Sequence, residues 1–188
     1  KNRRRYFTEG RSLAGARSGQ TRALKTENRD MPRLFTGLEI PAALGDSLSL
    51  LRGGLPGARW VDSENYHVTL RFIGDVDDAV AQEIEWQLGK VRRKEFELRI
   101  DGLQSFSGRK PRAIVAAVAP SPSVMELQAE HERLMQRVGL ESEGRKYTPH
   151  VTLARLRDTS SFEAAEYLSA RAAFRSPPFS VSAMCWIG

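Results

Sequence analysis

The sequence has little cysteine, little histidine and no long apolar run. Its 188 residues include three histidines and a single cysteine, Cys185. One cysteine cannot form an internal disulfide or by itself anchor a zinc or iron–sulfur site. This excludes a disulfide-stapled secreted scaffold and is typical of the reducing cytoplasm. The longest strongly apolar stretch, residues 113–119, is far too short to cross a bilayer. We therefore expect a cytoplasmic protein without a membrane segment.

Most of the chain has no net charge. The whole sequence has 29 basic and 23 acidic residues, but residues 1–30 hold nine basic and three acidic ones. Residues 31–188 therefore carry twenty of each sign. A broad basic face that grips duplex nucleic acid is not expected, although a local basic groove stays open.

The first thirty residues are polar and rich in Gly, Ser and Arg, without a sustained helical or strand period. This pattern predicts a disordered basic tail. Three interpretations of the tail stay open: translated upstream sequence or an expression remnant, an Arg-rich organellar presequence, and an arm that contacts RNA. The apolar core of a secretory signal does not follow the basic start.

Alternating strands and helices are predicted from Met31 onward. Strand periodicity covers residues 34–40, 66–73, 96–100, 114–118 and 148–156, and helical spacing covers 44–51, 77–88, 121–138 and 161–174. Short strands are expected from Trp60 and after Pro178. We predict one bilobal α+β domain over residues 31–188, with related halves at about 31–105 and 106–188. Antiparallel sheets would face a central cleft, with helices outside.

One tetrapeptide occurs once in each half. It is His67-Val68-Thr69-Leu70 in the first and His150-Val151-Thr152-Leu153 in the second. Side chains two apart on a strand share a face, so each His and Thr point one way while the Val and Leu point the other. Two such strands across a pseudo-two-fold axis would bring two imidazoles and two hydroxyls into one site.

This set of residues suits acid–base chemistry on a phosphate. One imidazole can serve as a neutral base while the other is a protonated acid, because imidazoles titrate near neutral pH. Threonine hydroxyls can hydrogen-bond the non-bridging oxygens of a phosphate. No carboxylate or cysteine shares the repeat, so the chemistry requires neither a metal nor a cofactor. Metal-dependent hydrolysis ranks lower, because no cluster of ligands is evident in the sequence.

Other residues near the repeats are placed by the phase of their strand or by their charge. Arg71 is in phase with His67, so we expect it on the cleft side near phosphate, whereas Arg155 is out of phase with His150 unless a bulge intervenes. Phe72 falls on the apolar side of its strand. The loop 105–112 is the densest basic patch outside the tail, and it either steers the RNA backbone or is a solvated hairpin. His131, between two glutamates on a helix, is expected to be structural or exposed.

These features together resemble the 2H phosphoesterase superfamily, whose signature is two H-x-T/S-x motifs about eighty residues apart. Within it, the sequence is similar to the bacterial and archaeal RNA 2′,3′-cyclic phosphodiesterases, also called 2′-5′ RNA ligases. The resemblance spans residues 31 to about 180, and the stretches that carry it are Pro32–Phe35, Leu55–Val61, Asn65–Asp75, Pro111–Arg112 and Pro149–Leu156.

The resemblance implies opening of a 2′,3′-cyclic phosphate at an RNA end, tRNA fragments being one source, to leave a 2′-phosphate. It implies that His67 is the general acid on the leaving 3′-oxygen and that His150 is the general base on water. It also implies that Thr69 and Thr152 bind phosphate, with Arg71 and Arg155 as further substrate contacts. Reversal of the reaction would join RNA ends through 2′-5′ bonds, and a monomer is expected.

The carboxyl end departs from the pattern of these relatives. They continue past the Pro177-Pro178 strand with a segment rich in Tyr, Ser and Gly, whereas this chain ends in Met184-Cys185-Trp186-Ile187-Gly188. We expect this change to leave a sheet edge unpaired. Two other functions stay open: a related enzyme that acts on another cyclic phosphate or a 2′-5′ linkage, and a catalytically silent module that binds RNA or nucleotides.

Overall fold

A computed structural model describes residues 5–6, 34–106, 110–181 and 186–187. Within them lie ten strands: β1 Arg5–Tyr6, β2 Leu34–Glu39, β3 Ala58–Trp60, β4 His67–Gly74, β5 Phe96–Leu98, β6 Ile100–Phe106, β7 Ala113–Val118, β8 His150–Leu156, β9 Phe179–Val181 and β10 Trp186–Ile187. The helices are α1 Ala42–Ser49, α2 Asp78–Leu88, α3 Pro122–Arg137 and α4 Ser161–Ser169, with a short 3-10 helix at Ser63–Asn65. None of the helices in this part of the chain combines the length and the apolar character that a membrane span requires.

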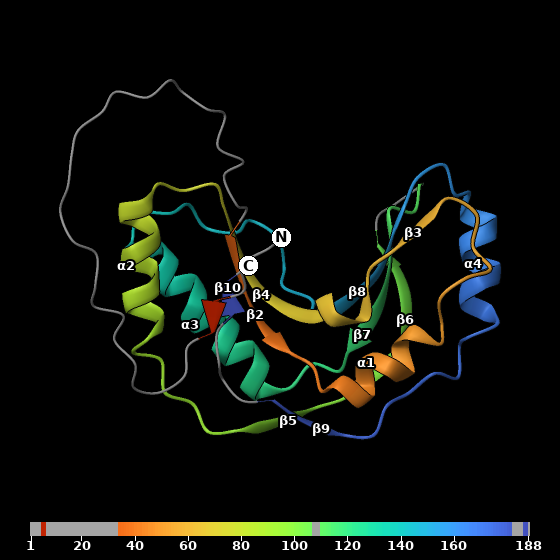
Figure 1. Ribbon diagram of the computed structural model, residues 1–188, viewed down its shortest axis with the longest axis horizontal. Coiled ribbons are helices and arrows are strands. Elements are labelled where there is room, and N and C mark those ends of the chain that lie inside the picture. Colours follow the sequence, from red (N-terminus) through yellow and green to blue (C-terminus); the bar gives the residue numbers. More distant parts are fainter. Residues whose placement is uncertain (1–4, 7–33, 107–109, 182–185, 188) are drawn as a thin grey trace, which may run out of the picture.

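Most of the strands form one sheet that bends into two lobes (Figure 1). Its order is β1-β10-β2-β4-β8-β7-β6, with β3 also paired to β8, while β5 and β9 form a separate two-stranded sheet. All pairs are antiparallel. We call β1, β10, β2 and β4 with α2 and α3 lobe 1, and β3, β6, β7 and β8 with α1 and α4 lobe 2. This arrangement confirms the predicted α+β architecture with antiparallel sheets.

Capping residues fix where three of the helices begin. Asp77 accepts a hydrogen bond from the Val80 amide at the start of α2, and Ser121 does so from the Val124 amide at the start of α3. Ser160 and Glu163 form a reciprocal capping box at the start of α4. Such caps satisfy amides that have no partner within the helix.

Each lobe contains elements from both halves of the sequence. The helix α3 comes from the second half but packs against β4, and β3 comes from the first half but pairs with β8. Buried apolar side chains on the helix-covered side of the sheet form one continuous core, which includes Leu38, Val68, Val151 and Leu153. A smaller cluster, with Ile84 and Met135, joins α2 to α3.

The carboxyl end differs from the expected unpaired edge. Strand β10 lies against β2, with Trp186 opposite Gly37, and β1 continues the sheet beyond it. Two residues of the expected tail, Arg5–Tyr6, therefore belong to a strand. The rest of that tail, residues 107–109 of the basic loop and residues 182–185 lie outside the described residues.

Candidate functional site

The two repeated motifs meet where the lobes join. Strands β4 and β8 are paired at one position, Val68 opposite Val151, and both valines are fully buried. Because the strands are antiparallel, His67 lies opposite Thr152 on one side of this pair, and Thr69 lies opposite His150 on the other side. These four side chains share the face opposite the valines, which we call the inner face, and each is partly exposed.

Matching hydrogen bonds orient the two imidazoles. His67 Nδ1 lies 2.7 Å from the Asn65 carbonyl oxygen, and His150 Nδ1 lies 2.8 Å from the Thr148 carbonyl oxygen. A carbonyl only accepts, so each Nδ1–H donates to it. In both rings Nε2 is then the nitrogen that takes up or releases a proton. The backbone two residues before each motif thus holds the same tautomer in both lobes.

Each histidine also packs against a phenylalanine, but with different geometry. Phe35 stacks on His67 with ring centroids 4.6 Å apart and 23° between the planes. Phe106 meets His150 edge-on, at 4.5 Å and 76°. Burial lowers the pKa of His150, although its hydrogen bond to Thr148 acts in the opposite direction. His150 is therefore neutral at neutral pH, which suits a proton acceptor.

A β-bulge follows the motif in each lobe. In lobe 1, Gly37 lies opposite Thr69 but Thr36 lies opposite Arg71, so Leu70 is an extra residue in β4. In lobe 2, Val115 lies opposite Thr152 but Ile114 lies opposite Ala154, so Leu153 is an extra residue in β8. An extra residue reverses the alternation of the strand beyond it. The bulges stand at the same place in both repeats, so Arg71 matches Ala154 and Phe72 matches Arg155.

The bulge overturns the expected position of Arg71. The residue is 8% exposed and lies opposite the buried Thr36, on the side of the sheet that α3 covers. Its Nε atom lies 2.6 Å from Glu132 Oε2, its Nη1 lies 3.6 Å from Glu143 Oε2, and the guanidinium also donates to the carbonyl oxygens of Phe72 and Glu141. Arg71 therefore faces away from the inner face.

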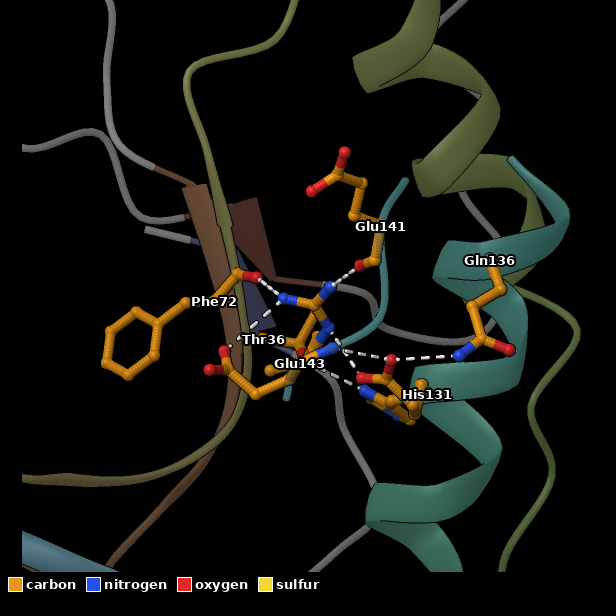
Figure 2. A network of polar contacts seen from close by, with 8 residues as sticks. Thr36, Phe72, His131, Gln136, Glu141 and Glu143 are labelled. Carbon is orange, nitrogen blue, oxygen red and sulfur yellow. Dashed lines mark hydrogen bonds and ion pairs between the residues drawn. The ribbon is translucent and has the colours of Figure 1, made fainter. Parts of the chain in front are cut away.

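The same bulge overturns the expected position of Phe72. Its side chain is 56% exposed and lies opposite Phe35, the residue that stacks on His67. Figure 2 shows Phe72 on one side of the strand, with Glu141 and His131 on the side toward α3. The inner face of lobe 1 thus continues beyond His67 and Thr69 as an exposed aromatic surface.

In lobe 2 the bulge brings Arg155 to the inner face. Arg155 is exposed and lies opposite Ala113 on one side and the exposed Arg59 of β3 on the other. Like charges directly opposite each other destabilise a sheet. Within the described part of the chain, no ion pair compensates either arginine. Two uncompensated guanidinium groups beside the site can bind a phosphate.

Sequence reasoning missed four residues of this surface: Phe35, Arg59, Phe106 and Gly37. Arg59 becomes visible only through the pairing of β3 with β8, and the two phenylalanines through their ring contacts with the histidines. A Cβ on Gly37 would meet the Val68 carbonyl oxygen at 3.0 Å and His67 Cδ2 at 3.4 Å, so this position gives His67 its room.

The structure also shows the surroundings of His131 and of part of the basic loop. His131 is fully buried, so it is structural rather than exposed, and its Nδ1 lies 2.9 Å from Thr36 Oγ1. In the basic loop, Lys110 forms an ion pair with Asp158 at 3.3 Å. No group of three or more His, Cys, Asp or Glu side chains gathers to hold a metal within the described ranges.

Known proteins are similar to this chain in sequence. A family model described as LigT-like phosphoesterase matches residues 38–115 and 117–184. The RNA 2′,3′-cyclic phosphodiesterase of Aeropyrum pernix is 34% identical over 125 residues, which are 65% of this chain and 69% of the relative. The enzyme of the same name from Bacillus subtilis is 26% identical over 130 residues, covering 66% and 71%.

Solved structures agree on the architecture. LigT of E. coli, crystallised with 3′-AMP, has a TM-score of 0.61 at 24% identity, over 80% of this chain and 83% of that one. TT0787 of Thermus thermophilus has a TM-score of 0.60 at 21% identity, covering 83% and 84%. Since the family model covers well over half of the sequence, this chain belongs to the LigT-like 2H phosphoesterases.

Proposed function

We propose that this protein hydrolyses 2′,3′-cyclic phosphates at RNA ends to 2′-phosphomonoesters, as a monomer in the cytoplasm. The observation that carries the proposal is the pairing of Val68 with Val151, which sets both His/Thr pairs on one face of the sheet. The names of the relatives, RNA 2′,3′-cyclic phosphodiesterases, support the choice of substrate.

His150 is the general base in this mechanism. Its neutral Nε2 takes a proton from water, whose oxygen forms a bond to phosphorus. The lowered pKa of His150, caused by burial, keeps this nitrogen unprotonated at neutral pH. An RNA hydroxyl in place of water would give a 2′-5′ linkage by the same step.

His67 is the general acid. Its Nε2–H donates a proton to the 3′-oxygen as the bond from phosphorus to that oxygen breaks, which leaves a 3′-hydroxyl and a 2′-phosphate. The stacked face of Phe35 suits a protonated imidazole, because an aromatic face carries partial negative charge. Thr69 and Thr152 donate hydrogen bonds to the non-bridging oxygens, between the two histidines.

Arg155 and Phe72 extend this site in opposite ways. Arg155, with Arg59 beside it, contacts phosphate groups of the RNA. Phe72 offers an exposed ring on which a base can stack. We do not assign a direct phosphate contact to Arg71, because its guanidinium is bound to Glu132 and to backbone carbonyls on the other side of the sheet.

The test is incubation of an oligonucleotide that ends in a 2′,3′-cyclic phosphate, in the presence of chelator, with 2′- and 3′-phosphate products resolved. The wild type should give the 2′-phosphate, and His67→Ala and His150→Ala should each lose about 10²–10⁴-fold in rate. A 3′-phosphate product, or unchanged turnover in either folded variant, would contradict the proposal. Binding without turnover by the wild type would indicate the silent module instead.

A further inference from the structure

The segment that leads into the second motif is bound to the first-motif strand by side chains. Residues 141–147, which we call the lead-in segment, connect α3 to β8 and end three residues before His150. Tyr147 Oη donates to the Thr69 carbonyl oxygen at 3.1 Å. Arg71 donates to the Glu141 carbonyl oxygen and pairs with the Glu143 carboxylate. The lead-in segment therefore lies along β4, beside Thr69 and Arg71.

A carboxylate of α3 completes this connection (Figure 2). Glu132 Oε2 lies 2.6 Å from Arg71 Nε, while Glu132 Oε1 accepts from the Glu143 amide at 3.0 Å and from the Gln136 side chain at 3.1 Å. Glu132 and Arg71 thus bind each other and also bind the same short stretch of backbone. The Arg71 side chain is 8% exposed and that of Glu132 is 17% exposed, so their ion pair is largely shielded from water, whereas Glu143 lies at the solvent-exposed edge of the network.

The matching segment in lobe 2 is bound in another way. The chain that leads into the first motif forms β3, and β3 pairs with β8 through its backbone, Trp60 lying opposite Ala154. Ala154 stands where lobe 1 has Arg71, since both residues follow the bulge in their strands. Within the described residues, β4 has no strand pairing at this edge other than Val68 with Val151. The Arg71 side chain thus takes the place of a backbone ladder.

We infer that Arg71 and Tyr147 are positioning residues that hold the lead-in segment, and through it His150, in register with the first motif. A single ladder pair joins the two motif strands directly, so their separation is also set by the two stretches that precede the motifs. The stretch before His67 is held on β8 by the backbone pairing of β3, whereas the lead-in segment before His150 is held on β4 by side chains. Catalysis by a pair of histidines is sensitive to such placement, because a displacement of about 1 Å can cost about 10²-fold in rate.

The variants Arg71→Lys and Tyr147→Phe test this inference. Lysine keeps the charge beside Glu132 but cannot bind two partners with a planar fork, and phenylalanine removes only the hydroxyl group. Matched controls are Arg175→Lys, at an exposed ion pair with Asp101, and Tyr167→Phe, whose hydroxyl donates to the Leu51 carbonyl oxygen in lobe 2.

The first readout is limited trypsin cleavage under native conditions, which needs no substrate. Arg145 and Lys146 are exposed within the lead-in segment, and Arg92 and Lys94 are exposed in the chain between α2 and β5. We expect each variant to raise cleavage at the first pair relative to the second, by about tenfold in the double variant, while the controls leave the ratio unchanged. A ratio within twofold of wild type in the folded double variant, or an equal rise at both places, would overturn the inference.

The second readout, turnover of the cyclic phosphate, rests on the proposed function. We expect kcat of the double variant to fall about 10- to 100-fold with a smaller change in KM, while the controls keep wild-type kcat. Unchanged kcat in a variant with a freed lead-in segment would contradict the positioning role. If the wild type does not turn over the substrate, the proposed function fails, whereas the trypsin ratio still tests how the segment is held. Should Arg71→Lys not fold, Tyr147→Phe tests the inference alone.

Discussion

The two lobes are nearly the same on their inner faces and different behind them. Pairing of β2 with β4 repeats position by position in the pairing of β7 with β8, including the bulge after each motif. Behind the sheet, lobe 1 buries Thr36 against His131 and Arg71 against Glu132, where lobe 2 has the apolar Ile114 and Ala154. The repeat is therefore preserved where it presents the His/Thr pairs and has diverged where it supports them.

The largest expected effect concerns the polar pair behind lobe 1. Burial lowers the pKa of His131 to about 4, so the folded protein holds it neutral. In the unfolded chain a histidine takes up its proton near pH 6.5. Above that pH His131 is neutral in both states and costs no stability. As the pH falls toward 4, the unfolded state is protonated while the folded state is not, so the free energy of unfolding decreases. The free energy of unfolding should drop by about 3 kcal/mol between pH 7 and pH 4 from this residue alone.

Making lobe 1 resemble lobe 2 checks this expectation. The double variant Thr36→Val with His131→Met removes both polar partners together, so neither is left buried without a hydrogen bond. Urea denaturation measures the free energy of unfolding at pH 7 and at pH 4. Its decrease between these pH values should be about 3 kcal/mol larger for the wild type than for the double variant. Equal losses would show that His131 is not the group that titrates.

A second, smaller effect comes from a position where the inner faces differ, Gly37 in lobe 1 and Val115 in lobe 2. A Cβ at Gly37 would crowd both the Val68 carbonyl and the His67 ring, and of these the ring is the one that can move. Gly37→Ala should therefore lower kcat about tenfold, and it should also lower thermal stability, because the tighter contact is with the Val68 backbone. Val115→Ala is the matched control, and kcat values that fall equally in both variants would contradict a role for Gly37 in placing His67.

The smallest effect is on salt dependence and separates Arg155 from its counterpart Phe72. Each phosphate contact to single-stranded nucleic acid contributes about 0.7 to the slope of log affinity against log salt. Arg155→Met should reduce that slope by about this amount, whereas Phe72→Leu should weaken binding without changing the slope. Oligonucleotide titrations at several KCl concentrations, with the His150→Ala variant as the host, give both slopes. If Arg155→Met has the same slope as the host, Arg155 does not contact a phosphate.

The sequence was sufficient to predict that the two His/Thr pairs share one face of the sheet, because the repeated His-Val-Thr-Leu and the strand period of two determine which side chains point the same way. The predicted helical range 77–88 agrees with α2 and its cap Asp77, because the helical period and a capping residue are local signals. Both signals lie within a few neighbouring residues.

The bulges were not predictable, and the positions of Arg71, Phe72 and Arg155 depend on them. Leu70 and Leu153 look like ordinary strand residues, since nothing local distinguishes a bulge from regular alternation. Each bulge is defined by the partner strand, β2 or β7, which lies thirty or more residues away in the sequence. The exchange of α3 and β3 between the lobes is likewise a property of long-range packing.

The central claim is that His67 gives a proton to the leaving 3′-oxygen and that His150 takes one from water. A cyclic phosphate in which sulfur replaces the 3′-bridging oxygen tests it most directly, because a thiolate leaves without being protonated. Turnover of this substrate and of the oxygen parent should be compared for the wild type, His67→Ala and His150→Ala. The account predicts that the rate loss caused by His67→Ala, relative to the wild type, is at least tenfold smaller on the sulfur substrate than on the oxygen parent. The loss caused by His150→Ala should be the same on both substrates. Equal losses on both substrates for His67→Ala, or restoration of His150→Ala instead, would contradict it.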